Sequence, residues 1–137
     1  MDLLPTKKDS ALLDKAWDLD QEALLRTKNK PKADRLWREA MKICKKLLKD
    51  FPKDINLLLK IATIYQHQSK FDKARYYLDK AQKFYPKNFL IEHNLGNLYR
   101  AEGNVKLALK YYKKALKHSD GNRLMKKILT TYKKLLT

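Results

Sequence analysis

The feature that most constrains this chain is an internal repeat with a period of 34 residues. When residues 55–88 are set above residues 89–122, aromatic residues fall on aromatic residues and small residues on small ones. The coinciding pairs include Tyr65 with Tyr99, Ala62 with Gly96, Ala74 with Ala108, and Tyr77 with Tyr111. A unit repeated at such a spacing cannot bury its apolar side alone, so its copies stack on their neighbours. The period therefore predicts an array of stacked units, with a partial third copy before residue 55.

Within each copy the apolar residues follow the spacing of one helix face. Leu107, Ala108, Tyr111 and Ala115, for example, recur at the intervals of an amphipathic helix. With 3 Gly and 4 Pro in 137 residues, turn-forming residues are too few for a many-stranded sheet. The sequence therefore predicts an all-α chain of about seven helices, near residues 10–28, 31–50, 54–68, 71–85, 88–101, 105–118 and 122–136.

A few residues predict how the helices begin and cross. Asp54 and Asn88 precede apolar runs and offer the side-chain oxygen that caps a helix N-terminus. Gly96 has no side chain, which predicts a close crossing of two helices with Tyr99 and Tyr111 filling its flanks.

The best-preserved copy resembles a tetratricopeptide repeat. Residues 94–120 hold a Leu-Gly pair, a tyrosine three residues later, a glycine turn, and then Ala, Tyr and Ala along the second helix. Residues 55–88 follow the same pattern, whereas residues 32–54 match the second helix alone. The resemblance implies a right-handed α-solenoid of helical hairpins. Its expected parts are a flexible arm at 1–9, an atypical extended hairpin at 10–54, repeats at 55–88 and 89–122, and a capping helix at 123–137.

The first helices of such repeats line a concave face on which ligands usually lie. Their residues that point away from the apolar stripe are polar and mildly basic: Asn56, Thr63, Gln66, His67, His93, Asn97, Arg100 and Lys127. Such groups suit an extended acidic peptide. We therefore expect a non-catalytic interaction module, an adaptor or scaffold, that binds an acidic peptide or an acidic protein surface.

The family's carboxylate clamp grips the acidic C-terminal tail of heat-shock chaperones with Lys, Asn and Arg side chains. The matching positions here are Leu59, Thr63, Asn94, Leu124 and Ile128, of which Asn94 alone agrees. An alignment that starts one repeat earlier gives Leu25, Asn29, Lys60, Leu90 and Asn94. Binding of chaperone tails is therefore disfavoured.

Lysine makes the chain strongly basic, with a net charge of +17. Part of this charge also repeats every 34 residues, in the rows Lys46, Lys80, Lys114 and Lys49, Lys83, Lys117. If the repeats stack, these rows form a ridge for polyanions, and the alternative function is a ribosome- or RNA-associated factor that contacts phosphates. A further hypothesis is that the acidic residues of segment 9–22 lie over these rows and mask them.

No pattern predicts catalysis, a cofactor or a metal site. The 3 Gly are too widely separated to form a nucleotide-binding loop. Cys44 lies on the apolar face of its helix, which predicts a buried, inert thiol. We expect His67 and His93 on the surface, too far apart to share a metal, and His118 in a last turn where a cation suits the helix dipole.

The ends of the chain carry two further expectations. The first ten residues lack the uninterrupted apolar run of a signal peptide, and no window approaches 18 apolar residues, so we expect a cytoplasmic protein without membrane contact. In segment 123–137 the apolar residues form two stripes, wider than one neighbour covers. This width has two interpretations: a capping helix that is seated deeply on the preceding repeat, or a homodimer through the C-terminal helix.

Overall fold

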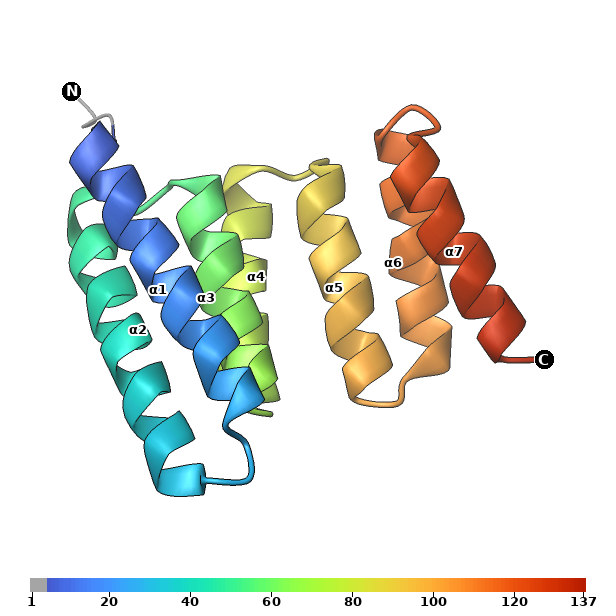
Figure 1. Ribbon diagram of the computed structural model, residues 1–137. Coiled ribbons are helices and arrows are strands. Elements are labelled where there is room, and N and C mark those ends of the chain that lie inside the picture. The colour runs from blue at the N-terminus through green and yellow to red at the C-terminus, as the bar shows by residue number, and fades with distance from the viewer. Residues whose placement is uncertain (1–4) are drawn as a thin grey trace. The chain divides into compact units, whose positions relative to one another are not determined.

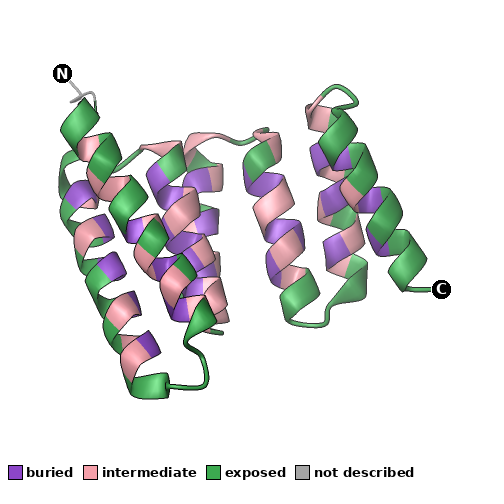
Figure 2. Ribbon diagram, in the orientation of Figure 1, coloured by how far each residue is buried: buried purple, intermediate pink, exposed green. Residues whose placement is uncertain are grey.

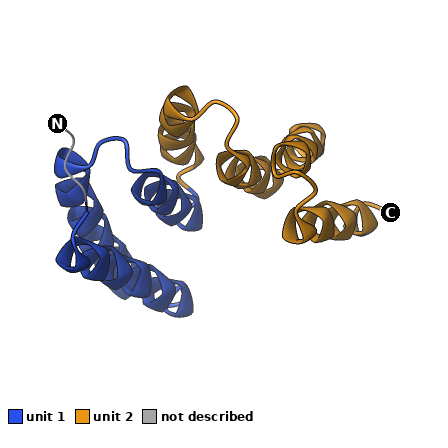
Figure 3. Ribbon diagram, turned by 90° about the horizontal axis from the view of Figure 1, so that it is seen from above, with its two compact units in different colours: residues 1–69 blue, residues 70–137 orange. Residues whose placement is uncertain are grey.

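The computed structural model describes residues 5–137, and every regular element in that range is an α-helix (Figure 1). The helices are α1 (Lys7–Leu25), α2 (Lys30–Asp50), α3 (Ile55–His67), α4 (Phe71–Phe84), α5 (Phe89–Ala101), α6 (Val105–His118) and α7 (Arg123–Leu135). They belong to two compact units, residues 1–69 with α1 to α3 and residues 70–137 with α4 to α7 (Figure 3). The predicted all-α fold of about seven helices is confirmed.

Side-chain caps begin α3 and α5 where the sequence predicts them. Asp54 Oδ1 accepts a hydrogen bond from the Leu57 N–H at 2.9 Å. Asn88 Oδ1 likewise accepts from the Leu90 N–H at 2.9 Å. Each bond satisfies a backbone donor that has no partner inside its own helix.

The first hairpin consists of two long helices, α1 with 19 residues and α2 with 21. α1 begins at Lys7 rather than residue 10, because Thr6 and Asp9 form a reciprocal capping box. The flexible arm expected at 1–9 is therefore wrong for residues 7–9, which are helical. Its first four residues lie outside the described residues.

In the first unit each of the three helices carries buried residues (Figure 2). α1 packs against both α2 and α3, with Ala16 and Ala23 fully buried at the contacts. The small side chains let the helix axes approach closely. Since α1 is part of this core, segment 9–22 is a packed helix and not a free arm, and masking of the lysine rows by its acidic residues, in the same chain or a neighbouring one, stays a prediction.

Cys44 lies at the centre of this core, with 0% of its surface exposed. Burial raises the pKa of its thiol to about 12, because the thiolate would lose its hydration. We expect no detectable reaction with a thiol reagent at pH 8 in the folded protein and one equivalent after unfolding in guanidinium chloride. A native protein that reacts as fast as the unfolded chain would contradict the burial.

In the second unit α5 packs extensively on α6, and α5 also contacts α4. The rings of Tyr99 and Tyr111 stack on each other at a centroid distance of 5.5 Å. The ring that lies against Gly96 is that of Tyr112. Arg75 on α4 pairs with Glu102 and lies 5.5 Å from the centre of the Tyr99 ring. This ion pair raises the pKa of Arg75 and joins α4 to the end of α5.

The last helix, α7, buries one of its two apolar stripes. Met125, Leu129 and Tyr132 are buried, whereas Leu124 and Leu135 are 58% and 65% exposed. Association of two copies through the exposed stripe stays a prediction. Within residues 5–137 no helix is both long enough and apolar enough to cross a bilayer.

Candidate functional site

The polar face of α5 is the candidate binding site of the second unit. His93, Asn97 and Arg100 are four and three residues apart and therefore lie on one side of the helix. Ile91 and Leu98 are fully buried, and they anchor the helix in the unit's core. The structure thus brings three of the predicted groove residues together.

A hydrogen-bonded chain orders the first two of these residues. The Tyr112 hydroxyl donates to Asn97 Oδ1 at 2.6 Å, and Asn97 Nδ2 lies 3.3 Å from His93 Nε2. Since the Asn97 oxygen is an acceptor, its amide nitrogen donates, which makes His93 Nε2 an acceptor and the imidazole neutral. Burial lowers the pKa of His93, which favours the same neutral form. His93 is half-buried, so its expected place on the open surface is wrong.

Arg100 supplies the exposed positive charge of this face. Its guanidinium lies 5.0 Å from the centre of the Tyr132 ring on α7, and the rings of Tyr132 and Tyr112 meet edge to face at 5.3 Å. The cation–π contact restricts the guanidinium and leaves its N–H groups able to donate to an anion. The pKa of Tyr112 is raised by burial, and the charge and hydrogen bond of Arg100 oppose that rise.

The sequence prediction did not include Tyr112 and Tyr132. Both lie on apolar faces of their helices, where an aromatic ring is expected in the core, and both are indeed buried. One signal was present for Tyr112: 34 residues earlier the repeat has Leu78, so the second copy adds a hydroxyl to a core position. A buried tyrosine hydroxyl needs a partner, which directs attention to a neighbouring polar helix face.

In the first unit the predicted groove residues all lie on α3 and are less available. Thr63 Oγ1 donates to the Leu59 carbonyl at 2.9 Å, and Gln66 is half-buried. Asn56 is exposed in the first turn. His67 Nδ1 lies 2.8 Å from Asp20 Oδ2, so this ring nitrogen is bound inside the unit. His67 is therefore a structural contact and not a free surface histidine as expected.

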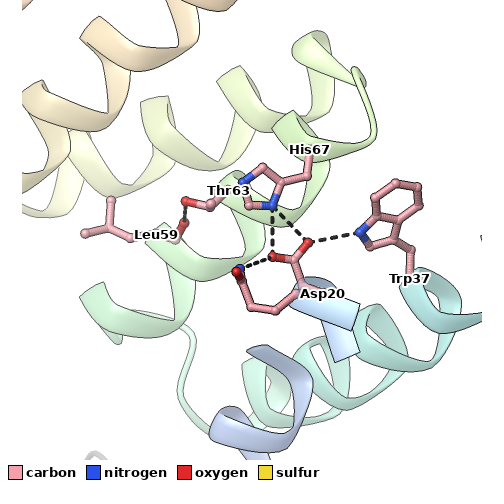
Figure 4. Close-up of polar contacts among 6 residues, drawn as sticks. Asp20, Trp37, Leu59, Thr63 and His67 are labelled. Atoms are coloured by element: carbon pink, nitrogen blue, oxygen red, sulfur yellow. Dashed lines mark hydrogen bonds and ion pairs between the residues drawn. The ribbon is translucent and has the colours of Figure 1, made fainter. Parts of the chain in front are cut away.

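Asp20 is the acceptor at the centre of this contact (Figure 4). Its side chain is fully buried between α1, α2 and α3, and its Oδ1 accepts from Trp37 Nε1 at 2.9 Å. Gln21 donates to Oδ2 at 3.2 Å. A buried carboxylate is tolerated because its oxygens are hydrogen-bonded. The sequence interpretation placed Asp20 in an exposed acidic segment. The one sequence feature that indicated its burial was its position on the same side of α1 as Ala16 and Ala23.

The second unit contains a similar pair between α5 and α6. Glu92, 2% exposed, lies 2.7 Å from His118 Nδ1. The helix dipole is therefore not the main reason for a histidine at this position, contrary to expectation. The Asp20–His67 pair and the Glu92–His118 pair each hold helices together. Neither pair belongs to the polar face of α5.

The six lysines of the predicted ridge lie on the second helices. Lys46 and Lys49 are on α2 in the first unit, whereas Lys80, Lys83, Lys114 and Lys117 are on α4 and α6 in the second. Four of the six are exposed, and Lys80 and Lys114 are half-buried, the latter with its Nζ 5.1 Å from the centre of the Tyr111 ring. None forms an ion pair with an acid of the described chain. Their function in polyanion binding stays a prediction.

Lys127, the remaining predicted groove residue, is exposed on α7. It lines a shallow hollow together with Lys126 and Thr131, separate from the hydrogen-bonded chain on α5. Across the part of the chain that the structure describes, no three His, Cys, Asp or Glu side chains are grouped to hold a metal ion.

Two segments of the chain match models of the tetratricopeptide repeat, residues 57–88 and residues 91–122. A comparison with curated protein sequences finds no match. The second segment includes the whole polar face of α5, so the candidate site lies inside a recognised repeat.

Solved tetratricopeptide repeat (TPR) domains have a similar fold. The first TPR of Spaghetti (RPAP3) bound to the HSP90 peptide SRMEEVD has a TM-score of 0.61 and 20% identity, over 90% of this chain and 94% of that one. The Sgt2 TPR domain of Aspergillus fumigatus has a TM-score of 0.64 and 21% identity, over 96% and 81%. The first TPR domain of human RPAP3 has a TM-score of 0.64 and 18% identity, over 90% and 94%.

Proposed function

The chain belongs to the tetratricopeptide repeat family, and from this premise we propose that it is a protein-interaction module that binds an acidic peptide on the polar face of α5. The observation that carries the proposal is the ordered set of His93, Asn97 and Arg100. Tyr112 and Tyr132 hold the last two of these in place. Groups ordered before binding lose little conformational entropy when a ligand arrives.

The chemistry of this face favours an acidic ligand. Arg100 offers a planar set of N–H donors that matches a carboxylate, and Asn97 offers an amide suited to a peptide backbone. The Spaghetti (RPAP3) domain supports the same ligand class, because its peptide SRMEEVD contains three acidic residues. In the alignment that places Leu59 first, Asn94 is the one clamp position that agrees with a chaperone-tail clamp. We therefore expect a different acidic peptide.

The proposal is tested with fluorescent decapeptides that carry three to five Glu or Asp residues, titrated with the full chain. We expect at least one to bind, and Arg100→Gln to weaken it about tenfold, because a charge-assisted hydrogen bond contributes on the order of 1.5–3 kcal/mol. Lys110→Gln on α6 is the matched control, since it removes one exposed charge elsewhere in the same unit. SRMEEVD is expected to bind no better than its scrambled version.

Two results would refute this function. One is a peptide set in which nothing binds more tightly than a neutral decapeptide. The other is an equal loss of affinity in Arg100→Gln and Lys110→Gln, which would show that net charge and not the polar face of α5 attracts the peptide.

A further inference from the structure

The solvent face of α7 concentrates positive charge more than the peptide site does. A shallow hollow on this helix is lined by six residues, Arg123, Lys126, Lys127, Thr130, Thr131 and Lys134, which we call the basic face. All six are exposed, and α7 contains no acidic residue. No ion pair within residues 5–137 involves its Arg or Lys side chains, so their charge is not neutralised inside the described chain.

The spacing of the basic face places a hydrogen-bond donor on every turn of the helix. Its members follow Arg123 by three, four, seven, eight and eleven residues, which keeps them on one side of α7. At about 1.5 Å per residue, the row from Arg123 to Lys134 is about 16 Å long. It therefore matches a linear ligand with a regular series of negative groups.

The side-chain types on this face suit phosphate groups. Arg, Lys and Thr are side chains that proteins use to contact phosphate oxygens of nucleic acids. A peptide-binding surface usually adds an apolar or aromatic anchor in a pocket, and the lining of this hollow contains none. No aromatic ring lines this face to stack on a base. We therefore expect contacts to phosphate oxygens to dominate and binding to depend little on nucleotide sequence.

The opposite side of α7 argues against a membrane surface as the ligand. An amphipathic helix that lies on a bilayer inserts its apolar side among the acyl chains. Here the apolar residues Met125, Leu129 and Tyr132 are buried in the second unit, where Tyr132 packs on Tyr112. The apolar side that would have to enter a bilayer is therefore occupied, and what remains free on α7 is the basic face and the exposed Leu124 and Leu135 beside it.

We propose that the basic face of α7 binds the phosphodiester backbone of a single-stranded nucleic acid, about four phosphates at a time, without sequence selectivity. This site is separate from the polar face of α5 and from the lysine rows on the second helices. It does not depend on the peptide-binding proposal.

The test titrates fluorescent oligouridine RNA and oligothymidine DNA, each about 12 nucleotides long, with the full chain at several salt concentrations. Four contacts on a single strand predict a slope of log affinity against log salt of roughly −3, at about −0.7 per phosphate. The double variant Lys126→Gln and Lys134→Gln removes two contacts and leaves Lys127 in place. We expect it to reduce the slope to roughly −1.5 and the affinity at 50 mM salt at least fivefold.

Two matched double variants test whether the affinity depends on the basic face of α7, on the total charge of the chain or on the lysine rows. Lys7→Gln with Lys8→Gln removes the same charge from exposed positions on α1, and Lys83→Gln with Lys117→Gln removes it from α4 and α6. The proposal predicts that both keep most of the affinity for the two oligonucleotides. It is overturned if either loses as much as the α7 variant, or if an oligoglutamate peptide of equal length binds as tightly as the oligonucleotides. Peptide binding that is lost in Arg100→Gln and retained in the α7 variant would keep the two proposals separate.

Discussion

Gly96→Ala is expected to lower the free energy of unfolding by about 1–3 kcal/mol, although alanine is intrinsically the better helix former by about 1 kcal/mol. A Cβ atom at Gly96 would lie 2.5 Å from Cε1 and 2.6 Å from Cδ1 of the Tyr112 ring. That ring cannot move away at low cost, because it is buried, packs on Tyr132 and is hydrogen-bonded to Asn97. Gly96→Leu should cost more. Urea titration followed by circular dichroism measures both variants.

The repeat itself supplies the control for this prediction. At the equivalent positions 34 residues earlier, the chain has Ala62 in place of Gly96 and Leu78 in place of Tyr112. The double variant Gly96→Ala with Tyr112→Leu should therefore recover part of the stability lost in Gly96→Ala. An unchanged midpoint for Gly96→Ala would show that the two helices do not cross as closely as described.

Asp20→Ala is expected to destabilise the first unit by about 2–4 kcal/mol. The substitution removes the acceptor of the Trp37 indole N–H and the partner of His67, and it leaves a cavity among α1, α2 and α3. A buried donor without a partner costs about 1–3 kcal/mol. Urea unfolding monitored by tryptophan fluorescence measures the loss.

Asp20→Asn is the matched control, because its amide oxygen still accepts from Trp37 in a side chain of the same size. Trp37→Phe removes the donor, so combining it with Asp20→Ala should cost less than the sum of the two single changes. Equal stability of Asp20→Ala and the unsubstituted protein would refute the buried contact. Strict additivity in the double variant would refute the coupling to Trp37.

Local signals in the sequence explain where prediction of the fold succeeded. The caps Asp54 and Asn88 work through backbone groups two or three residues away, so nearby sequence suffices to place the starts of α3 and α5. The start of α1 was missed because Thr6 and Asp9 were not recognised as a capping box, although the pattern is equally local.

The candidate site was predicted less completely, for a physical reason. His93, Asn97 and Arg100 share one helix face, which periodicity reveals. Tyr112 and Tyr132, which order that face, come from other helices and depend on how these helices cross. The same is true of the basic face of α7: its spacing is visible in the sequence, but packing decided which apolar stripe of α7 is buried.

Periodicity and capping were thus sufficient to predict seven helices, because the spacing of apolar residues and the caps both act within one or two turns of the chain. The partners of the polar side chains were decided by packing. Asp20 binds Trp37 and His67, 17 and 47 residues away, and Glu92 binds His118 26 residues away. A buried carboxylate must find a donor wherever the helix crossings put one, and the residues next to Asp20 or Glu92 in the sequence do not indicate which side chain of another helix that will be.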